Sequence, residues 1–397
     1  MTDAQVIIVG AGPVGLVAAL ALSRGGVDCL VLEARDTPDT RLRASTFHPP
    51  TLDMLAELGL AEPLIAEGLI TACWQLRQHE SGESVEFDLG TIADVTAHPF
   101  RLQCEQHHLC ALILATLRAE GRCRVITGCT VTGCRQDADG VTVTAEQAGA
   151  AAEYQAPWLV AADGAESAVR GALGLAYGGH TYEHASVLVT TDFPFHDHIP
   201  GLCNVTYCWS GSGPFSLLRL KHAWRASLYP GRGQDLAALA EAPPLRAALA
   251  RIVPEAGDAE LLGINPYRVH ERSMARYRVG RVLFAGDAAH LNAPSGGMGM
   301  NGGIHDAINL AAKLGAVLAG ADDALLDRYH RQRYHLATRG TIPQAADNRA
   351  RMAGSDVASQ LERLAALRAI AADPERHRAF ALRSAMFSGL EEAEGIP

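Results

Sequence analysis

Apolar residues follow two different periods along this chain. Continuous apolar runs of four or five residues predict buried strands at 6–9, 28–32, 158–162 and 281–285. Apolar residues repeated every three or four positions predict helices at 13–24, 103–117, 303–318 and 325–339. Alternating apolar and polar residues predict further strands, with 123–134 and 141–144 paired as a hairpin and several more between 72 and 99 and between 176 and 266.

The order of these elements predicts an α/β protein with an inserted β domain. A Rossmann-like nucleotide domain is expected from three separate segments, and a mostly antiparallel substrate sheet from two. Residues 355–386, rich in Ala, Leu and Arg, predict further helix. The expected division is 1–71, 100–175 and 267–345 for the nucleotide domain, 72–99 and 176–266 for the substrate domain, and 346–397 for C-terminal helices.

A glycine fingerprint follows the first strand directly. In GAGPVG at 10–15, Gly10 permits the tight turn, Gly12 lets the backbone approach a pyrophosphate, and Gly15 lets the helix pack on the strand. The second strand ends in Glu33, which is placed to bind ribose hydroxyls. This context predicts dinucleotide binding without deciding between FAD and NAD. A second match at 297–302 does not directly follow a strand, so it is not interpreted as a fingerprint.

Residues 280–314 form the stretch around which the rest of the chain is organised. Its strand ends at Gly286-Asp287, and a strand-end carboxylate can accept hydrogen bonds from sugar-like hydroxyls. A Gly-rich loop, expected to hold no regular structure, comes next. The positive end of the following helix would point back at this loop, which suits a flavin that gains negative charge. The alternative is a strand, a flexible connector and a core helix without a ligand.

Three further groups of polar residues are candidates for a site. Asp163-Gly164 ends another strand and precedes either a capped helix start or a second cofactor contact. Gln103 and Gln106 near the start of a helix could bind a cofactor hydroxyl. Arg43 suits a phosphate or is a solvated charge. Arg219 and Lys221 share a strand face, which suits a phenolate or carboxylate, or is a solvated sheet face.

Composition and charge exclude several classes of protein. The net charge of −10, without a Lys/Arg cluster, argues against nucleic acid as a partner. The nine cysteines lack a CxxC pair, which predicts a reducing cytoplasm and no structural metal. The apolar segment 6–22 has no basic residues before it and is interrupted by glycines. It is therefore expected to be neither a secretion signal nor a membrane span.

Three motifs in order identify a family resemblance over residues 4–345: GAGPVG at 10–15, DGAESAVR at 163–170 and GDAAHLNAPSGGMGMNGG at 286–303. With these, the chain resembles single-component flavoprotein aromatic hydroxylases, the class that includes para-hydroxybenzoate hydroxylase. RASTFHPPTLDMLAELGL at 43–60 is similar to the phenylpropionate and polyketide hydroxylases. Met298 stands where relatives often have Gln, which predicts a more apolar flavin edge.

The resemblance implies bound FAD. The implied cofactor-binding residues are Gly10, Gly12, Pro13, Gly15, Glu33, Ala34, Arg35, Arg43, Ala44, Ser45, Thr46, Gln103, Gln106, Asp163, Gly164, Arg225, Gly286, Asp287, Pro294, Gly297, Gly299, Met300 and Asn301. The implied catalytic residues are Arg219, Tyr207, Pro294 and His48. Arg219 and Arg225 have the spacing of two family arginines that serve the substrate carboxylate and flavin movement. Tyr207 is either a phenol-proton contact or a core tyrosine.

The implied reaction is hydroxylation of a phenolic or N-heterocyclic ring. NADH or NADPH, bound transiently, reduces FAD, and dioxygen then gives a flavin hydroperoxide that transfers oxygen to the ring. The expected partners are a small aromatic substrate and O2, with no nucleic acid and no membrane. The C-terminal helices are expected to pack on the nucleotide domain or to form a homodimer. The alternatives are a flavin-dependent reductase or desaturase of a lipid-like substrate, and a catalytically silent flavin-binding protein.

Overall fold

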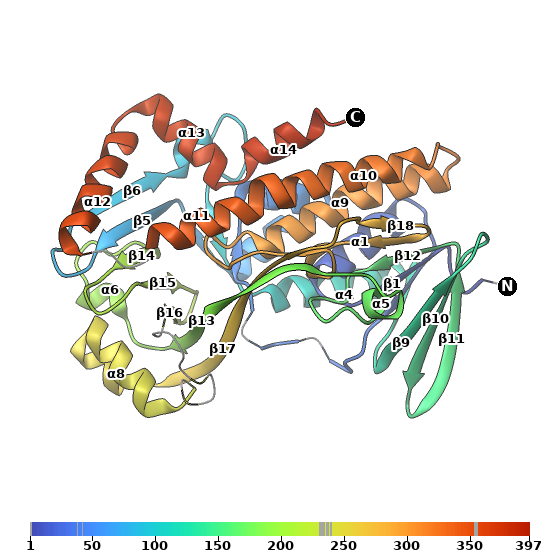
Figure 1. Ribbon diagram of the computed structural model, residues 1–397, viewed down its shortest axis with the longest axis horizontal. Helices are drawn as coiled ribbons and strands as arrows, with labels where there is room; N and C mark the ends of the chain where they lie inside the picture. Colours follow the sequence, from blue (N-terminus) through green and yellow to red (C-terminus); the bar gives the residue numbers. More distant parts are fainter. Residues whose placement is uncertain are drawn as a thin grey trace.

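The computed structural model describes residues 2–37, 39–41, 43–229, 235, 238, 240–352 and 356–397, with the backbone alone at 184 and 185. A six-stranded sheet forms the centre of the nucleotide-binding half (Figure 1). In spatial order its strands are β18 (Arg278–Val279), β19 (Val282–Phe284), β12 (Trp158–Ala161), β1 (Val6–Val9), β2 (Cys29–Leu32) and β8 (Cys123–Ile126). All pairs except β18 with β19 are parallel, which confirms the Rossmann-like prediction.

The predicted hairpin is present but begins later than expected. β8 joins the six-stranded sheet beside β2, and a turn at Gly128, with φ of +62°, separates it from the hairpin. The hairpin strands belong to a three-stranded antiparallel sheet of β9 (Cys129–Gln136), β10 (Val141–Gln147) and β11 (Ala150–Ala156). This small sheet projects from one end of the molecule (Figure 1).

Helices cover the six-stranded sheet. They include α1 (Pro13–Arg24), α4 (Gln106–Glu120) and α9 (Gly299–Leu318), with α5 (Ala168–Ala172) after β12 and the short turn η3 (Gly286–Ala288) after β19. The prediction that α9 begins near Gly303 was wrong by four residues. A Cβ at Gly303 would meet Val14 Cγ2 at 2.6 Å and Gly286 Cα at 3.1 Å. Gly303 therefore allows α9 to pack closely on α1 and η3, whereas the Gly-rich composition had suggested a loop at this position.

A small sheet lies beside the nucleotide half. It contains β3 (Thr46–Phe47), β7 (Arg101–Gln103) and β4 (Leu69–Thr71), and α2 (Pro49–Glu57) and α3 (Ala61–Glu67) connect two of its strands. Gln103 pairs with Thr46 in this sheet, so the helix predicted from Gln103 begins only at Gln106. The apolar period of the helix extended by chance into the preceding strand.

The inserted segments form a mostly antiparallel sheet, as predicted, and β20 (His290–Leu291) and the end of β17 (Leu261–Ser273) extend it to eight strands. In spatial order its strands are β20, β17, β13 (Gly178–Thr191), β16 (Trp224–Leu228), β15 (Phe215–Arg219), β14 (Val205–Trp209), β5 (Cys73–Gln78) and β6 (Ser84–Asp88). Only the pairing of β14 with β5 is parallel. β17 runs without a break across residue 266, so the long β13–β17 pair joins the two halves of the molecule.

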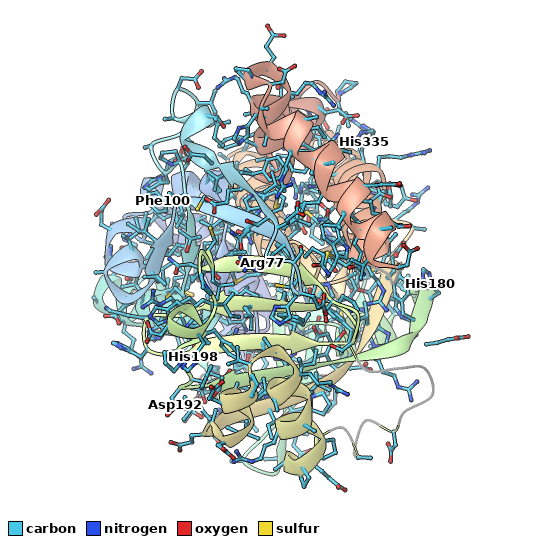
Figure 2. The ribbon with its side chains drawn as sticks, turned by 90° about the vertical axis from the view of Figure 1, so that its left-hand side faces the viewer. Arg77, Phe100, His180, Asp192, His198 and His335 are labelled. Atoms are coloured by element: carbon cyan, nitrogen blue, oxygen red, sulfur yellow. The ribbon has the colours of Figure 1, made fainter. Side chains whose placement is uncertain are left out.

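Helices cover this sheet at both ends (Figure 2), where the green strands lie between yellow α8 and the red C-terminal helices. One face of β13, β15 and β16 packs on α8 (Ala242–Ile252), α6 (Phe195–His198) and the turn η2 (Pro254–Asp258). At the other end, Trp74 and Phe87 of β5 and β6 pack on helices α12 (Val357–Ala371) and α13 (Pro374–Ser384). The turn η1 (Leu89–Ile92) also contacts α13.

The C-terminal helices thus correct an expectation. α12 and α13 pack on the substrate sheet, because β5 and β6 present an apolar face there, whereas packing on the nucleotide domain was one of the two alternatives expected. α10 (Ala324–His335) packs on α9, and it continues through a π-helical turn (Leu336–Thr341) into α11 (Ile342–Met352). α14 (Phe387–Glu394) returns to α10. Ser355, where the predicted helix begins, lies outside the described residues. No helix in the described part of the chain is long and apolar enough to cross a membrane.

Candidate active site

An elongated cavity of about 1330 Å³ brings together the motifs that are far apart in the sequence. It runs from the carboxyl ends of the parallel strands to the inner face of the eight-stranded sheet. Gly10 and Gly12 of the fingerprint, the strand-end acids Glu33, Asp163 and Asp287, and part of the Gly-rich loop line it. We call this the first cavity. Its position at the ends of parallel strands is typical of nucleotide sites in α/β sheets.

The three fingerprint glycines differ in what surrounds them. Gly10 has φ of +102°, and a Cβ there would come 2.4 Å from the carbonyl oxygen of Ala162. A Cβ at Gly15 would come 2.0 Å from the carbonyl oxygen of Gly10, so helix α1 packs tightly there. A Cβ at Gly12 would meet no protein atom within 4 Å, and Gly12 lines the cavity. The space beside Gly12 is therefore open to a ligand.

The strand-end carboxylates have different hydrogen-bond partners. Glu33 accepts hydrogen bonds from the backbone N–H of Ala11 (2.7 Å) and of Arg35 (3.0 Å). Asp163 Oδ2 accepts from the Val169 N–H (3.1 Å) at the start of α5, while Oδ1 is buried without a partner. Burial raises the pKa of Asp163. Asp163 thus accepts from one N–H group at the start of α5, whose N-cap is Ser167, and it keeps one oxygen for a ligand.

Hydrogen bonds of Asn301 and His48 attach the Gly-rich loop, residues 294–298, to the small sheet. Asn301 Nδ2 donates to the carbonyl oxygens of Thr46 (2.8 Å) and Gly297 (2.7 Å), and Asn301 Oδ1 accepts from the His48 N–H (2.9 Å). His48 Nε2 lies 2.8 Å from the Gly296 carbonyl oxygen, which can only accept, so Nε2 carries the hydrogen. Burial and the charge of Arg101 hold the pKa of His48 well below its ordinary value. His48 does not line the first cavity, and its hydrogen bond to Gly296 holds the loop in place.

A second cavity of about 660 Å³ lies on the other side of the Gly-rich loop. Tyr207, Tyr229 and Ser295 line both cavities. The rest of its lining comes from the Gly-rich loop, from β5 and β7, and from the helices between α9 and α14, and it includes Trp74, Leu76, Arg101, Met298, Arg351 and Phe380. Met298 therefore faces this second cavity, whereas the sequence had placed it at the cofactor. The two cavities therefore adjoin each other at Tyr207, Tyr229 and Ser295.

The structure separates the two candidate arginines. Ser216 and Leu218 of β15 line the first cavity, so Arg219 points to the opposite face, where its guanidinium lies over the Trp224 ring at 6.0 Å. Lys221 lies beyond the strand and donates to the Ala66 carbonyl oxygen (2.7 Å). The pair, expected either on a cavity wall or on a solvated sheet face, is thus not on the wall of the first cavity, because alternate residues of β15 face opposite sides of the sheet.

Arg225 is the arginine that faces the first cavity. Its side chain is 2% exposed, and Nη1 donates to the Arg43 carbonyl oxygen (2.9 Å). Nε and Nη2 are buried without hydrogen-bond partners, although Glu105 lies 3.7 Å from Nη2. Arg225 therefore has donors available to a ligand in this cavity.

Most of the predicted cofactor residues line the first cavity. They are Gly10, Gly12, Pro13, Glu33, Ala34, Arg35, Arg43, Ala44, Ser45, Thr46, Gln106, Asp163, Gly164, Arg225, Asp287, Pro294, Gly297, Gly299 and Met300. Gly15, Gln103, Gly286 and Asn301 lie behind this lining. Gln103 Oε1 accepts from the Thr46 hydroxyl (2.9 Å), and a Cβ at Gly286 would meet Val14 Cγ2 at 2.8 Å. These four support the wall and do not form its surface.

A buried ionic cluster behind the site was not predicted. Asp306 of α9 accepts hydrogen bonds from the Gly286 N–H (3.0 Å), His290 Nε2 (2.7 Å) and Arg333 Nε (2.5 Å). Burial would raise the pKa of Asp306, but the charges of Arg333 and His290 outweigh it and hold the pKa at about 2. The signal available in the sequence was an aspartate on the apolar face of a predicted helix, because such a residue needs a buried partner.

Comparison with known proteins identifies the family. Residues 3–342 match the model of a family described as an FAD-binding domain. The chain belongs to this family. Among its relatives, para-nitrophenol 4-monooxygenase of Pseudomonas sp. (strain WBC-3) is 32% identical over 364 residues, 90% of this chain and 89% of the relative. The 6-hydroxy-3-succinoylpyridine 3-monooxygenase HspB of Pseudomonas putida (strain DSM 28022 / S16) is 29% identical, covering 87% of this chain and 88% of the relative.

A solved structure extends this match to the whole fold. The crystal structure of p-nitrophenol 4-monooxygenase PnpA from Pseudomonas putida DLL-E4 superposes with a TM-score of 0.91 at 31% identity, covering 98% of both chains. The protein is therefore an FAD-dependent monooxygenase that hydroxylates an aromatic substrate, and NAD(P)H is the reductant typical of this class. These relatives do not favour the two alternatives, a flavin-dependent reductase or desaturase of a lipid-like substrate and a catalytically silent flavin-binding protein.

The first cavity fits FAD. Gly12 leaves room for a pyrophosphate, the free oxygen of Asp163 and the side chain of Asp287 can accept from hydroxyls, and α9 begins at the Gly-rich loop. Bound there, the flavin supplies the redox chemistry that activates dioxygen. The chain supplies binding, orientation and exclusion of water.

Proposed function

We propose that the first cavity holds FAD and that the second cavity holds the aromatic ring to be hydroxylated. Gly10, Gly12 and Glu33 would bind the ADP half, and Asp287 the ribityl chain. The flavin ring would lie against Pro294 and the loop. The observation that carries this proposal is that Tyr207, Tyr229 and Ser295 line both cavities. A ring in the second cavity would therefore lie next to the reactive end of the cofactor.

The walls of the second cavity suit a small phenol or N-heterocycle. Trp74, Leu76, Met298 and Phe380 supply apolar and aromatic surface, which binds a flat ring and excludes water. Tyr207 would contact the phenolic oxygen and take part in moving its proton. The relatives' names support this substrate class, since they specify a nitrophenol and a hydroxypyridine derivative.

The domain division follows the same two sites. We propose 1–71, 100–175 and 267–345 as the FAD-binding domain and 72–99 with 176–266 as the substrate domain. The strand β17 then connects the two, and the C-terminal helices from residue 346 close the second cavity. We also propose a cytoplasmic location, which the absence of any CxxC pair among nine cysteines supports. A homodimer is proposed as the assembly and is tested by the mass of the protein in solution.

Turnover measurements test this function. The purified FAD-loaded protein is supplied with NADH or NADPH and a panel of phenols and hydroxypyridines, while reductant oxidation, oxygen uptake and peroxide are followed together. We expect one ligand class to stimulate reductant oxidation, with oxygen consumed in excess of peroxide released. If no ring compound stimulates oxidation, or if all the oxygen appears as peroxide, the second cavity is not a hydroxylation site.

A further inference from the structure

Arg101 is a buried cation with unused hydrogen-bond donors. It lies on β7, is 3% exposed, and lines the second cavity. Its Nε and Nη1 have no hydrogen-bond partner, and its guanidinium lies 5.2 Å from the centre of the Trp74 ring. No pattern in the sequence distinguishes this arginine, because it lies in a short strand close to Gln103, which was assigned to the cofactor.

Among the residues that the structure describes, no acidic side chain forms an ion pair with Arg101. Burial lowers the pKa of the Arg101 guanidinium, and Tyr207, which lines the same cavity, partly opposes this effect. Burial and the charge of Arg101 hold the pKa of His48, at the start of α2, below its ordinary value. The acidic residues that line the same cavity, Asp347 and Glu392, are exposed, and Glu392 is paired with His335 (2.8 Å). A guanidinium remains charged even when buried, and the Trp74 ring recovers only part of the cost of its burial. A cavity lined by a buried guanidinium without an ion-pair partner favours an anionic ligand.

We propose that Arg101, together with the Tyr207 hydroxyl, binds the ionised phenolic oxygen of the substrate. This inference rests on the proposed placement of the ring in the second cavity. The phenol O–H bond breaks as the ligand binds, the proton goes to solvent, and the electron pair stays on the oxygen. A charge-assisted hydrogen bond from a guanidinium lowers the pKa of the bound phenol. The resulting phenolate ring is richer in electrons and reacts more readily with an electrophilic oxygen.

Binding of 4-nitrophenol tests this directly, because its phenolate absorbs visible light and its neutral form does not. The oxidised FAD-loaded protein is titrated with 4-nitrophenol at a pH about one unit below the pKa of the free ligand, without reductant. We expect the bound ligand to show the phenolate band. Arg101→Met should abolish this band and weaken binding about 10- to 100-fold, and Arg101→Lys should restore part of both.

Arg77 provides a matched control, and it is labelled in Figure 2. It lies on β5, is 6% exposed and also has an unpartnered Nε, but it lines neither cavity. Arg77→Met should keep the phenolate band and the affinity. Equal weakening by both variants would assign the effect to loss of structure and overturn the proposal, as would failure of the wild type to bind 4-nitrophenolate.

Two further measurements separate the remaining outcomes. If 4-nitrobenzoate binds as tightly as 4-nitrophenol with the same dependence on Arg101, the arginine recognises a carboxylate and the phenolate assignment is wrong. The titration needs no turnover, so Arg101-dependent phenolate binding without any hydroxylation would contradict only the proposed function. Hydroxylation of phenols at unchanged rate and affinity in Arg101→Met would contradict only the role of Arg101.

Discussion

The three strand-end carboxylates differ most in what remains available to a ligand. Both oxygens of Glu33 accept backbone hydrogen bonds, and Asp163 uses one oxygen to accept from an N–H group at the start of α5. The Asp287 side chain has no hydrogen-bond partner in the described part of the chain, and it is accessible from the first cavity. A hydroxyl-rich ligand would therefore gain most from Asp287.

Asp287→Ala should lose FAD. Removing a carboxylate that accepts from ribityl hydroxyls is expected to weaken FAD binding by about 10- to 100-fold, since hydrogen bonds to charged groups contribute about 1.5–3 kcal/mol. Flavin retained after gel filtration and the Kd from flavin fluorescence measure the effect. Asp258→Ala, an exposed aspartate of η2, is the control and should retain flavin. Stoichiometric flavin at unchanged affinity in Asp287→Ala would show that this carboxylate does not bind the cofactor.

At the scale of single residues, sequence patterns located the first cavity better than the second. Motif residues such as Gly12 and Asp163 each follow closely on a predicted strand, and the carboxyl ends of parallel strands bring them to the same edge of the sheet. The sequence left open which side of the sheet Arg219 faces, because a one-residue shift in β15 moves every side chain to the other face. Arg101 and Asp306 became visible only when strands and helices from distant segments were brought together.

At the scale of elements, the Gly-rich loop depends on contacts behind it. Gly296 and Gly297 have φ of +98° and +68°, so the loop needs glycine at both positions. Asn301, in the first turn of α9, connects the loop to β3 and to the start of α2. The composition predicted a loop without regular structure and left a flexible connector as the alternative, but polar side chains of neighbouring elements attach the loop at defined points.

Asn301→Ala should loosen this loop. The change leaves the Thr46 and Gly297 carbonyls and the His48 N–H without their partner, so we expect a loss of about 2–4 kcal/mol in the free energy of unfolding. Less of the consumed oxygen should then appear in product and more as peroxide, because water reaches the site. Asn309→Ala, two turns further along α9, is the control and should not change the ratio of peroxide to reductant. An unchanged ratio in Asn301→Ala, despite lower stability, would show that the loop does not need this attachment for coupling.

At the scale of the whole molecule, the parallel sheet and the inserted antiparallel sheet followed from hydrophobic periods. The way in which the parts are joined did not. β17 crosses the expected domain boundary, and α12 and α13 cover the apolar face of β5 and β6. Periodicity shows that a helix has an apolar side, but it does not show which of two apolar surfaces that side covers.

The Asp306 cluster joins α9, α10 and the strand-end turn η3 across the nucleotide half. The pKa of Asp306, about 2, lies below its usual range, so its contribution to stability is present above about pH 4 and is lost as the pH falls toward 2. Asp306→Asn leaves Arg333 buried without its ion pair, and we expect a loss of about 3–5 kcal/mol at neutral pH. Urea unfolding at neutral and acid pH measures both effects. Asp327→Asn, whose side chain is 55% exposed, is the control and should stay close to the wild type. A wild-type stability that does not fall between pH 4 and 2 would contradict this assignment.

Closure of the second cavity depends on α13 packing on the substrate sheet. Phe380 is 7% exposed, its ring centre lies 4.4 Å from that of Phe87 and 5.7 Å from that of Trp74, and it also lines the cavity. Phe380→Ala should lower the free energy of unfolding by about 3–5 kcal/mol through the space it leaves. Since the same space would admit water beside the ring to be hydroxylated, peroxide released per reductant oxidised should rise, and the KM for the aromatic substrate should rise with it.

The matched control for this change is Phe387→Ala on α14, a half-buried ring in a separate apolar cluster that does not line the cavity. It should lower stability without changing the peroxide ratio. If Phe380→Ala is destabilised but keeps the wild-type ratio and KM, the C-terminal helices stabilise the sheet without sealing the site. A rise confined to Phe380→Ala would instead assign α13 to the wall that keeps water from the reacting ring.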